Sequence, residues 1–322
     1  MCLRRFCLAC VALSLVAGCK KSDATGKPTV AVVPKGQLAL FWQSVHAGAV
    51  RGGRDSGVDV SWNGPQAETD LDAQIRIIDD MLAKGVKAFV LAPQDKDQLN
   101  NKIEAIHKRM PIVIVDSGCS TKDYTSFVAT NNRRGGEMAG EEMLRLLGDN
   151  GGEVAMIRNV PGAASTTERE DGFKSAIAKN SKVKLVEEPF CNGDAGVAAE
   201  KAGALMVAHP NLAGFFGSAE PAAVGIQNAL VSNNKAGKLK FVGFDAGEQL
   251  KEGLDAGRID ALVVQDPVEM GRLAVVTAAK ALKGETVPKE QPMEPTLVTQ
   301  QNKNDPKIKQ LLTPDISTEL QR

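Results

Sequence analysis

Short apolar runs alternate with helix-like segments along most of this chain, and this alternation restricts the folds open to it. The clearest example is residues 239–271. There an apolar run, 239–244, leads to Asp245, a helix-compatible segment follows, and a second run, Ala261–Val264, leads to Gln265. Short apolar runs between helical patterns are typical of buried parallel strands with helices on both faces of the sheet. The pattern therefore predicts an α/β fold.

The same alternation occurs in two successive sets of similar size. Strands are predicted at 29–33, 58–62, 88–91, 112–115, 126–129, 153–157, 184–187, 214–217, 239–244 and 261–264. Helices are predicted from residue 40 and at 67–84, 97–109, 133–147, 166–178, 195–208, 222–233, 247–256 and 267–282. Because 322 residues allow two domains with a core each, we expect two similar, doubly wound lobes with parallel sheets.

Composition excludes some classes of partner and of chemistry. Basic and acidic residues balance at 39 each, and no basic stretch predicts a nucleic-acid groove. No nucleophile elbow or phosphate loop occurs, and no CxxC or Cys/His metal spacing occurs from Cys19 onward, so no enzyme activity, cofactor or metal is expected.

The N-terminus has the features of an export signal. Arg4 and Arg5 precede an apolar stretch, 6–16, that is too short to span a bilayer as a mature helix. Small residues then lead to Cys19 and an abrupt polar turn, which resembles the bacterial lipoprotein signal. That resemblance implies a signal peptide at 1–18, a lipid on Cys19 and a tether at 19–28. The alternative is a plain secretory signal cleaved at Ala17 or Gly18.

Two cysteines besides Cys19 would remain after cleavage. An exported chain meets an oxidising compartment, so a disulfide between Cys119 and Cys191 is permitted. We expect them on loops of opposite lobes, where a bond would tie the lobes together. The sequence does not tell whether their Cα atoms come within bonding range.

Polar side chains follow two of the predicted strands. In an open α/β sheet, ligands lie beyond the carboxyl ends of the strands, where Asp245 and Gln265 are expected. The alternative is that Asp245 caps the next helix and Gln265 is a linker residue.

The segment VGFD, followed by a helix and a strand that ends in Gln265, resembles the sugar-binding branch of the type I periplasmic binding proteins. The resemblance covers about residues 29–302. It implies a three-stranded hinge with crossings near Asn131, Gln265 and Pro292. The first lobe would comprise 29–131 plus 267–293, and the second 132–266 plus 294–322.

The resemblance also implies a set of ligand-binding residues. Phe41 and Trp42 match an aromatic pair that packs on a sugar ring, and Arg169 lies in a matching R-x-x-G-F motif. The implied set comprises Phe41, Trp42, Asp116, Ser117, Arg169, Glu220, Asp245 and Gln265. Core or surface packing for the aromatic pair, an ordinary strand end for Asp116 and a solvated helix position for Arg169 remain alternatives.

Some positions depart from the family pattern. Ala92 and Ala219 replace asparagines, Ser117 replaces an arginine, and Gly193 replaces an aromatic residue that covers the second face of the sugar. Each change removes a polar or stacking contact, so the ligand is expected to differ from ribose, being larger or accompanied by water.

The function implied is that of a lipid-anchored, extracytoplasmic solute-binding protein. It would be monomeric, would stand at the periplasmic face of the membrane through its lipid alone, and would close its lobes around a small carbohydrate for delivery to an ABC permease. The alternative is a ligand-sensing receptor of the same fold, for chemotaxis or signalling. A repressor would need a helix-turn-helix before the core, where residues 1–28 read as signal and tether instead.

Overall fold

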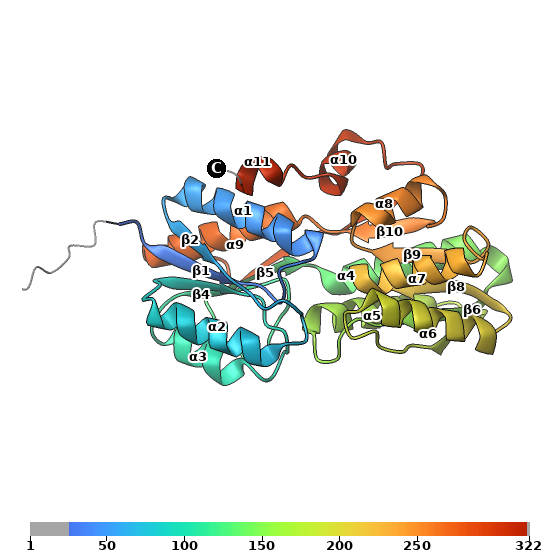
Figure 1. The fold of residues 1–322 in the computed structure, drawn as a ribbon, viewed down its shortest axis with the longest axis horizontal. Coiled ribbons are helices and arrows are strands. Elements are labelled where there is room, and N and C mark those ends of the chain that lie inside the picture. The colour runs from blue at the N-terminus through green and yellow to red at the C-terminus, as the bar shows by residue number, and fades with distance from the viewer. Residues whose placement is uncertain (1–25, 321–322) are drawn as a thin grey trace, which may run out of the picture.

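A computed structural model describes residues 26–320 and shows two α/β lobes, each built on a six-stranded sheet (Figure 1). The strand orders are β11-β5-β4-β3-β1-β2 in the first lobe and β12-β10-β9-β8-β6-β7 in the second. The predicted α/β fold with two doubly wound lobes is confirmed.

The first lobe places helices on both faces of its sheet. Its strands are β1 Thr29–Val33, β2 Asp59–Trp62, β3 Ala88–Leu91, β4 Ile112–Val115, β5 Ser126–Thr130 and β11 Glu290–Met293. Its helices are α1 Leu40–Ser56, α2 Leu71–Ala83, α3 Asn100–His107 and α9 Pro267–Leu282. Val30 and Val32 pack with residues of α1 and α9, whereas Ala31 and Val33 pack with residues of α2 and α3. This two-sided burial explains why the strands read as continuous apolar runs.

The second lobe repeats this arrangement. Its strands are β6 Gly152–Ile157, β7 Val183–Glu187, β8 Leu212–Gly217, β9 Lys240–Phe244, β10 Ala261–Val264 and β12 Thr296–Thr299. Its helices are α4 Asn132–Leu147, the 3-10 turn η1 Gly148–Asn150, α5 Ala164–Ile177, α6 Ala195–Ala208, α7 Glu220–Ser232 and α8 Glu248–Asp255. Residues of α4 and α5 pack on one face and residues of α6, α7 and α8 on the other. A parallel sheet was expected, but strand β12 pairs antiparallel with β10, so this sheet is mixed.

The chain passes between the two sheets at three places, after β5, after β10 and after β11. Asn131, at the first passage, caps α4 by accepting a hydrogen bond from the Arg134 N–H at 3.2 Å. Asp266, at the second, caps α9 by accepting from the Glu269 N–H at 3.0 Å. Both passages therefore end in a capped helix, which sets the direction in which the chain enters the next lobe.

The C-terminal segment forms two further helices, α10 Pro306–Leu312 and α11 Ser317–Leu320, where no element was predicted. Figure 1 shows this segment, in dark red, running over both lobes. The side chain of Leu312 is buried in the core of the second lobe, but α11 packs on α1, and Glu319 pairs with Arg54 of that helix. Assignment of all of 294–322 to the second lobe is therefore wrong, because the last helix finds its packing partner on the first.

Two predicted helices begin later than expected. Helix α2 starts at Leu71 rather than residue 67, because Asp70 caps it by accepting from the Ala73 N–H at 2.9 Å. Helix α3 starts at Asn100 rather than residue 97.

No disulfide joins Cys119 and Cys191, both of which are free thiols. Cys191 is fully buried in the core of the second lobe, and Cys119 packs against the core of the first lobe. Burial raises the pKa of both thiols, that of Cys119 to about 11. The structure thus corrects the proposed bond: the two cysteines are packing residues of separate lobes.

Helices α4 and α5 approach so closely that only glycine fits between them. A Cβ atom on Gly136 would lie 1.9 Å from the backbone oxygen of Arg169, and one on Gly172 would lie 2.2 Å from the oxygen of Arg133. The glycine of the R-x-x-G-F motif is therefore a packing requirement that sets the position of the Arg169 backbone.

We expect Gly136→Ala to lower the free energy of unfolding by about 2–4 kcal/mol, since a methyl group forces two backbones apart in a packed core. Gly203→Ala in α6 is the matched control, because its Cβ would meet no atom within 4 Å. That change should be neutral or stabilise by up to about 1 kcal/mol. Chemical denaturation of both variants measures the difference. Equal stabilities would contradict the close-packing assignment.

Candidate functional site

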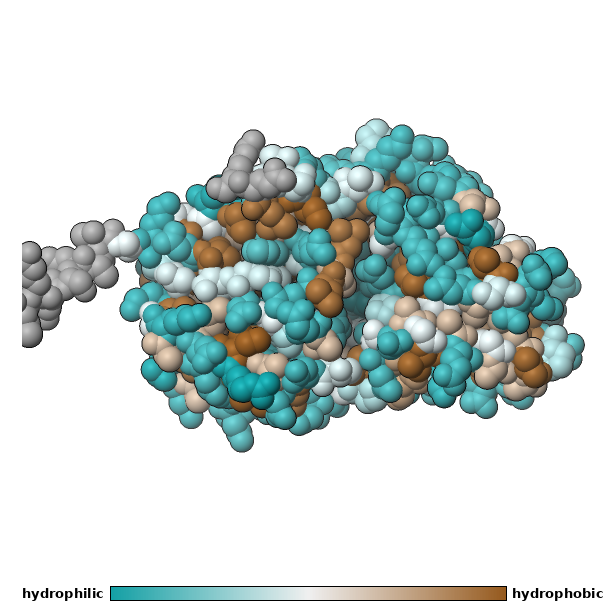
Figure 2. Space-filling view, viewed as in Figure 1, coloured by the Kyte–Doolittle hydropathy of each residue, from teal (hydrophilic) through white to brown (hydrophobic). Residues whose placement is uncertain are grey.

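A cleft between the lobes brings together the loops that follow the carboxyl ends of the strands. Figure 2 shows the surface hollowed between the two lobes. One hollow in this cleft spans about 400 Å³, including space that is open to solvent. It is lined by Lys35, Ala39, Phe41, Trp42, Glu68, Asp116, Asn159, Ser165, Thr166, Arg169, Ala219, Glu220, Pro221, Asp245 and Gln265. Seven of the eight sequence-predicted ligand residues line this hollow.

Two aspartates face the cleft from corresponding positions in the two lobes. Asp116 directly follows β4, Asp245 directly follows β9, and their φ angles are 62° and 72°. Left-handed backbone is costly for most side-chain-bearing residues, and aspartate tolerates it better than most. The turn ends each strand and leaves a carboxylate at its carboxyl end, where ligands of α/β sheets lie.

Lys35, which the sequence analysis did not select, pairs with Asp116. The Lys35 Nζ lies 2.8 Å from Asp116 Oδ2 and donates to Ser165 Oγ, on the second lobe, at 3.1 Å. Both charged side chains are buried, with exposed fractions of 5% and 3%. Lys35 thus compensates the buried carboxylate and bridges the cleft.

Arg169 is held in place from several sides. Its Nε donates to Asn132 Oδ1 at 2.8 Å, and a terminal nitrogen donates to the Ser218 carbonyl at 3.2 Å. The guanidinium lies over the ring of Phe244, 3.8 Å from its centroid. Since Arg169 is only 3% exposed, these contacts fix its orientation in the cleft. The ring of Phe244 therefore supports the Arg169 guanidinium on one face.

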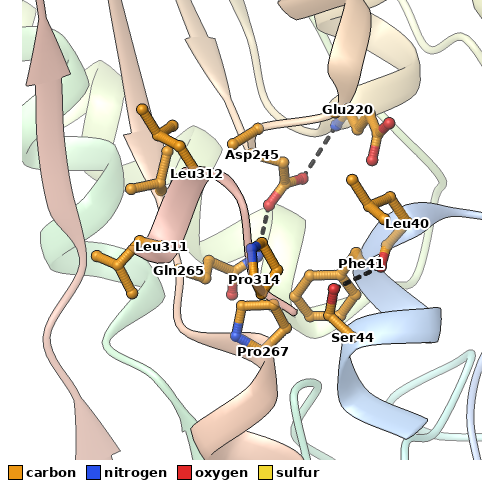
Figure 3. A pocket seen from close by; sticks show the side chains of 13 residues that line it. Leu40, Phe41, Ser44, Glu220, Asp245, Gln265, Pro267, Leu311, Leu312 and Pro314 are labelled. Atoms are coloured by element: carbon orange, nitrogen blue, oxygen red, sulfur yellow. Dashed lines mark hydrogen bonds between the residues drawn. The ribbon is translucent and has the colours of Figure 1, made fainter. Parts of the chain in front are cut away.

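Asp245, Gln265 and Glu220 form a hydrogen-bonded group (Figure 3). Asp245 accepts from Gln265 Nε2 at 2.7 Å and from the Glu220 N–H at 3.0 Å. Gln265 Oε1 accepts from Thr130 Oγ1, in the first lobe, at 2.7 Å. The Gln265 amide therefore connects the two lobes beside the hinge.

The two residues of the aromatic pair, Phe41 and Trp42, differ in burial and in their contacts. Trp42 is buried, 1% exposed, and its indole Nε1 donates to Glu68 Oε1 at 2.6 Å. Phe41 meets it edge to face, with ring centroids 4.9 Å apart, and lines the cleft more openly. A fixed aromatic surface of this kind suits the C–H face of a sugar ring.

Ser117 is the predicted ligand residue that does not line the hollow. It is fully buried, and its Oγ accepts a hydrogen bond from the Ser165 N–H at 3.3 Å. It therefore joins the lobes. Ser165 itself does not cap α5, because Ala163 is the N-cap and Ser165 accepts a hydrogen bond from Lys35.

Five polar lining residues were missed by the sequence analysis: Lys35, Glu68, Asn159, Ser165 and Thr166. Lys35 and Asn159 follow strands β1 and β6, so the strand-end rule that selected Asp245 and Gln265 could have found them. Glu68 lies in a loop after β2, where no local signal distinguishes it.

The cleft offers both kinds of hydrogen-bonding group side by side. Lys35 and Arg169 donate, the carboxylates accept, and each cation has an aspartate nearby, at 2.8 Å for Lys35 and 3.9 Å for Arg169. Such a set matches a neutral ligand whose hydroxyls both donate and accept. Residues 26–320 contain no group of three or more His, Cys, Asp or Glu side chains arranged to hold a metal ion.

A family model described as "Periplasmic binding protein domain" matches residues 30–286. The ribose import binding protein of Escherichia coli is 26% identical over 285 residues, 87% of this chain and 93% of that protein. The D-ribose/D-allose-binding protein of Pseudomonas aeruginosa is 28% identical over 82% of this chain and 85% of that protein.

Solved structures agree with this assignment. A carbohydrate transporter solute-binding protein from Agrobacterium radiobacter, in complex with D-arabinose, superposes with a TM-score of 0.87 and is 34% identical, covering 90% of this chain and 100% of that one. An ABC transporter solute-binding protein from Agrobacterium vitis with bound D-fucose has a TM-score of 0.85 and 33% identity, covering 88% and 100%.

The chain belongs to the periplasmic binding protein family, in its type I, sugar-binding branch. Its relatives are solute-binding proteins of transport systems and not enzymes, which confirms the prediction that the chain is not an enzyme. The family is one of exported, periplasmic proteins, in agreement with the predicted export.

Burial and the neighbouring carboxylates of Asp245 and Glu68 raise the pKa of Glu220 to about 7, against 4.5 for the unperturbed group. In the folded state the Glu220 carboxyl therefore keeps its proton to higher pH than it does in the unfolded chain. The stability that this proton binding contributes is complete below pH 4.5 and is lost as the pH rises to 7 and beyond.

The free energy of unfolding of the protein should fall between pH 5 and pH 8 as Glu220 loses its proton. Because glutamine does not ionise, we expect this fall to be about 1–3 kcal/mol smaller in Glu220→Gln. Denaturant titrations of the protein and the variant at both pH values measure this. Glu248→Gln, an exposed change nearby, is the control and should leave the pH dependence as it is. An unchanged pH dependence in Glu220→Gln would contradict the raised pKa.

Proposed function

We propose that this protein is the extracytoplasmic receptor of an ABC importer for a small carbohydrate. The observation that carries the proposal is the arrangement of the cleft: buried charged donors and acceptors alternate around a fixed aromatic surface, between two lobes. Relatives with D-arabinose and D-fucose bound, and with ribose import in their names, support the class of ligand.

The proposed mechanism is closure of the two lobes around the ligand. Polar contacts across the cleft support it: Lys35 to Ser165 at 3.1 Å, the Ser165 N–H to Ser117 at 3.3 Å, and the Lys96 N–H to the Gly162 carbonyl at 3.1 Å. Contacts of this kind are easily exchanged with water, whereas the passages at Asn131 and Asp266 are connected by the backbone. Opening would therefore rotate the lobes about these passages.

We expect Arg169→Gln to weaken carbohydrate binding by about 2–4 kcal/mol, roughly 30- to 1000-fold in dissociation constant. The change removes a buried charged donor whose position three contacts fix. A thermal-shift screen with common pentoses and hexoses identifies a ligand, and calorimetry measures its affinity.

Arg134→Gln is the matched control for this measurement. Arg134 lies on the exposed side of α4 and pairs with Glu141 at 3.0 Å, so its loss should change neither affinity nor stability much. Binding at full affinity by Arg169→Gln would remove this arginine from the site. Failure of the protein to bind any sugar of the panel would refute the carbohydrate proposal.

We further propose that Cys19 carries a lipid that holds the protein at the membrane. Cys19 lies outside the described residues, and the proposal rests on the small residues before it. None of the helices described for 26–320 is both long and apolar enough to cross a bilayer.

Cys19→Ser should move the protein from the membrane fraction to the soluble periplasmic fraction, because it removes the site of lipid attachment. Fractionation followed by immunoblotting tests this, with Cys119→Ser as the control that keeps its membrane association. If the Cys19→Ser protein still sediments with membranes, the anchor is elsewhere.

A further inference from the structure

A second cavity adjoins the polar cleft and differs from it in character. It spans about 380 Å³, including space that is open to solvent, and Phe41, Glu220, Asp245 and Gln265 line both spaces. The remaining wall is mainly apolar and comes from three parts of the chain: Leu40 of α1, Val264 and Pro267 beside the hinge, and Leu311 and Leu312 of α10 (Figure 3). We call this cavity the annex.

The polar side chains at the annex, apart from the Glu220 carboxyl, already have hydrogen-bond partners within the protein. Ser44 Oγ donates to the Leu40 carbonyl at 2.9 Å. Both carboxylate oxygens of Asp245 accept hydrogen bonds, at 2.7 and 3.0 Å, and Gln265 Oε1 accepts one from Thr130. A ligand hydroxyl pushed into the annex would lose its water partners and find few replacements, whereas an apolar group would lose nothing.

The Glu220 carboxyl lies at the boundary between annex and cleft and receives no hydrogen bond from the rest of residues 26–320. It can bind a ligand hydroxyl on the cleft side. A molecule held there by its hydroxyls would direct its opposite end past Phe41 into the annex.

The C-terminal segment makes the outer wall of the annex a fixed part of the fold. Leu312 is 8% exposed and packs in the core of the second lobe, with Ile308 and Leu311 against the same core. Lys303 pairs with Asp255 at 2.5 Å before α10, and Glu319 pairs with Arg54 of the first lobe after it. Held at both ends, α10 cannot leave the annex without breaking these contacts.

We propose that the annex is an apolar subsite that selects deoxy sugars. These are carbohydrates that carry a methyl group in place of the hydroxymethyl group of the parent sugar, or a hydrogen in place of a hydroxyl group. This inference rests on the proposed carbohydrate-binding function and adds the class of sugar. Leu311 is the specificity-determining residue, because it faces the annex from a helix that Leu312 anchors separately.

Calorimetry with matched sugar pairs tests the proposal at neutral pH. The probes are D-fucose with D-galactose, L-rhamnose with L-mannose, 6-deoxy-D-glucose with D-glucose, 6-deoxy-D-allose with D-allose, and 5-deoxy-D-ribose with D-ribose. For the pair that binds most tightly, the deoxy sugar should bind about 10- to 100-fold more tightly, on the scale set by a methyl-sized difference in an apolar pocket.

In Leu311→Asn the affinities for the deoxy sugar and for its hydroxylated partner should differ by no more than about threefold, because asparagine offers a hydrogen-bond partner to the extra hydroxyl group. Ile308→Asn is the matched control: it lies on the same helix and packs on the same core but does not line the annex. Any loss of stability should be shared by both variants, whereas only Leu311→Asn should change the ratio of affinities.

The outcomes separate the two proposals. If no sugar binds, the carbohydrate function and the subsite are both wrong. If sugars bind and the hydroxylated member of the tightest pair is bound as well as or better than its deoxy partner, the subsite alone is wrong. A preference for the deoxy sugar that persists in Leu311→Asn, or disappears equally in Ile308→Asn, would also overturn the role of the annex.

Discussion

Buried carboxylates at the ends of two strands constrain how the rest of this structure is built. Asp116 is 2% exposed and Asp245 9%, and a carboxylate at such burial requires compensation. Asp116 obtains it from Lys35, whereas Asp245 obtains it from the Gln265 amide and the Glu220 N–H, with Arg169 nearby. The compensating groups come from other loops, so the loops are held where they define a cleft.

The same groups connect the lobes. Lys35 reaches from the first lobe to Ser165, and Thr130 reaches from the end of β5 to Gln265 at the end of β10. Ligand hydroxyls that compete for Lys35 or Gln265 would act on both lobes at once. In the proposed mechanism, binding and the relative position of the lobes would therefore be coupled through single side chains.

Local patterns predicted most of the fold because the strands are buried on both faces and the helices on one. Val30–Val33 and Ala261–Val264 are uninterrupted apolar runs, and such runs have few alternatives to a central strand. The pattern failed for β12, which is only four residues long, and for α10, where exposed polar residues alternate with a few apolar ones. Strand β12 is stabilised by pairing with β10, and α10 is stabilised by packing on the core of the second lobe. Neither contact can be predicted from the local sequence.

The strand-end rule predicted Asp245 and Gln265 as cleft residues from sequence, since the carboxyl ends of parallel strands meet at one edge, and Asp116 came from the family resemblance. Resemblance added the aromatic pair and Arg169. Ser117 could not be assigned correctly, because its hydroxyl faces Ser165, which is 48 positions away. Glu68 could not be found, because it reaches Trp42 from a loop 26 positions away.

The sequence by itself determined the two-lobed α/β architecture and the edge of the sheets at which a ligand binds, since both follow from apolar periodicity and from strand direction. Only the tertiary structure decided which charges neutralise which, that the cysteines pack in separate lobes, that α10 packs on the second lobe and walls the annex, and that α11 crosses to the first lobe. Those outcomes depend on distances between segments far apart in the chain. Local sequence patterns do not predict these distances, because packing of the whole chain sets them.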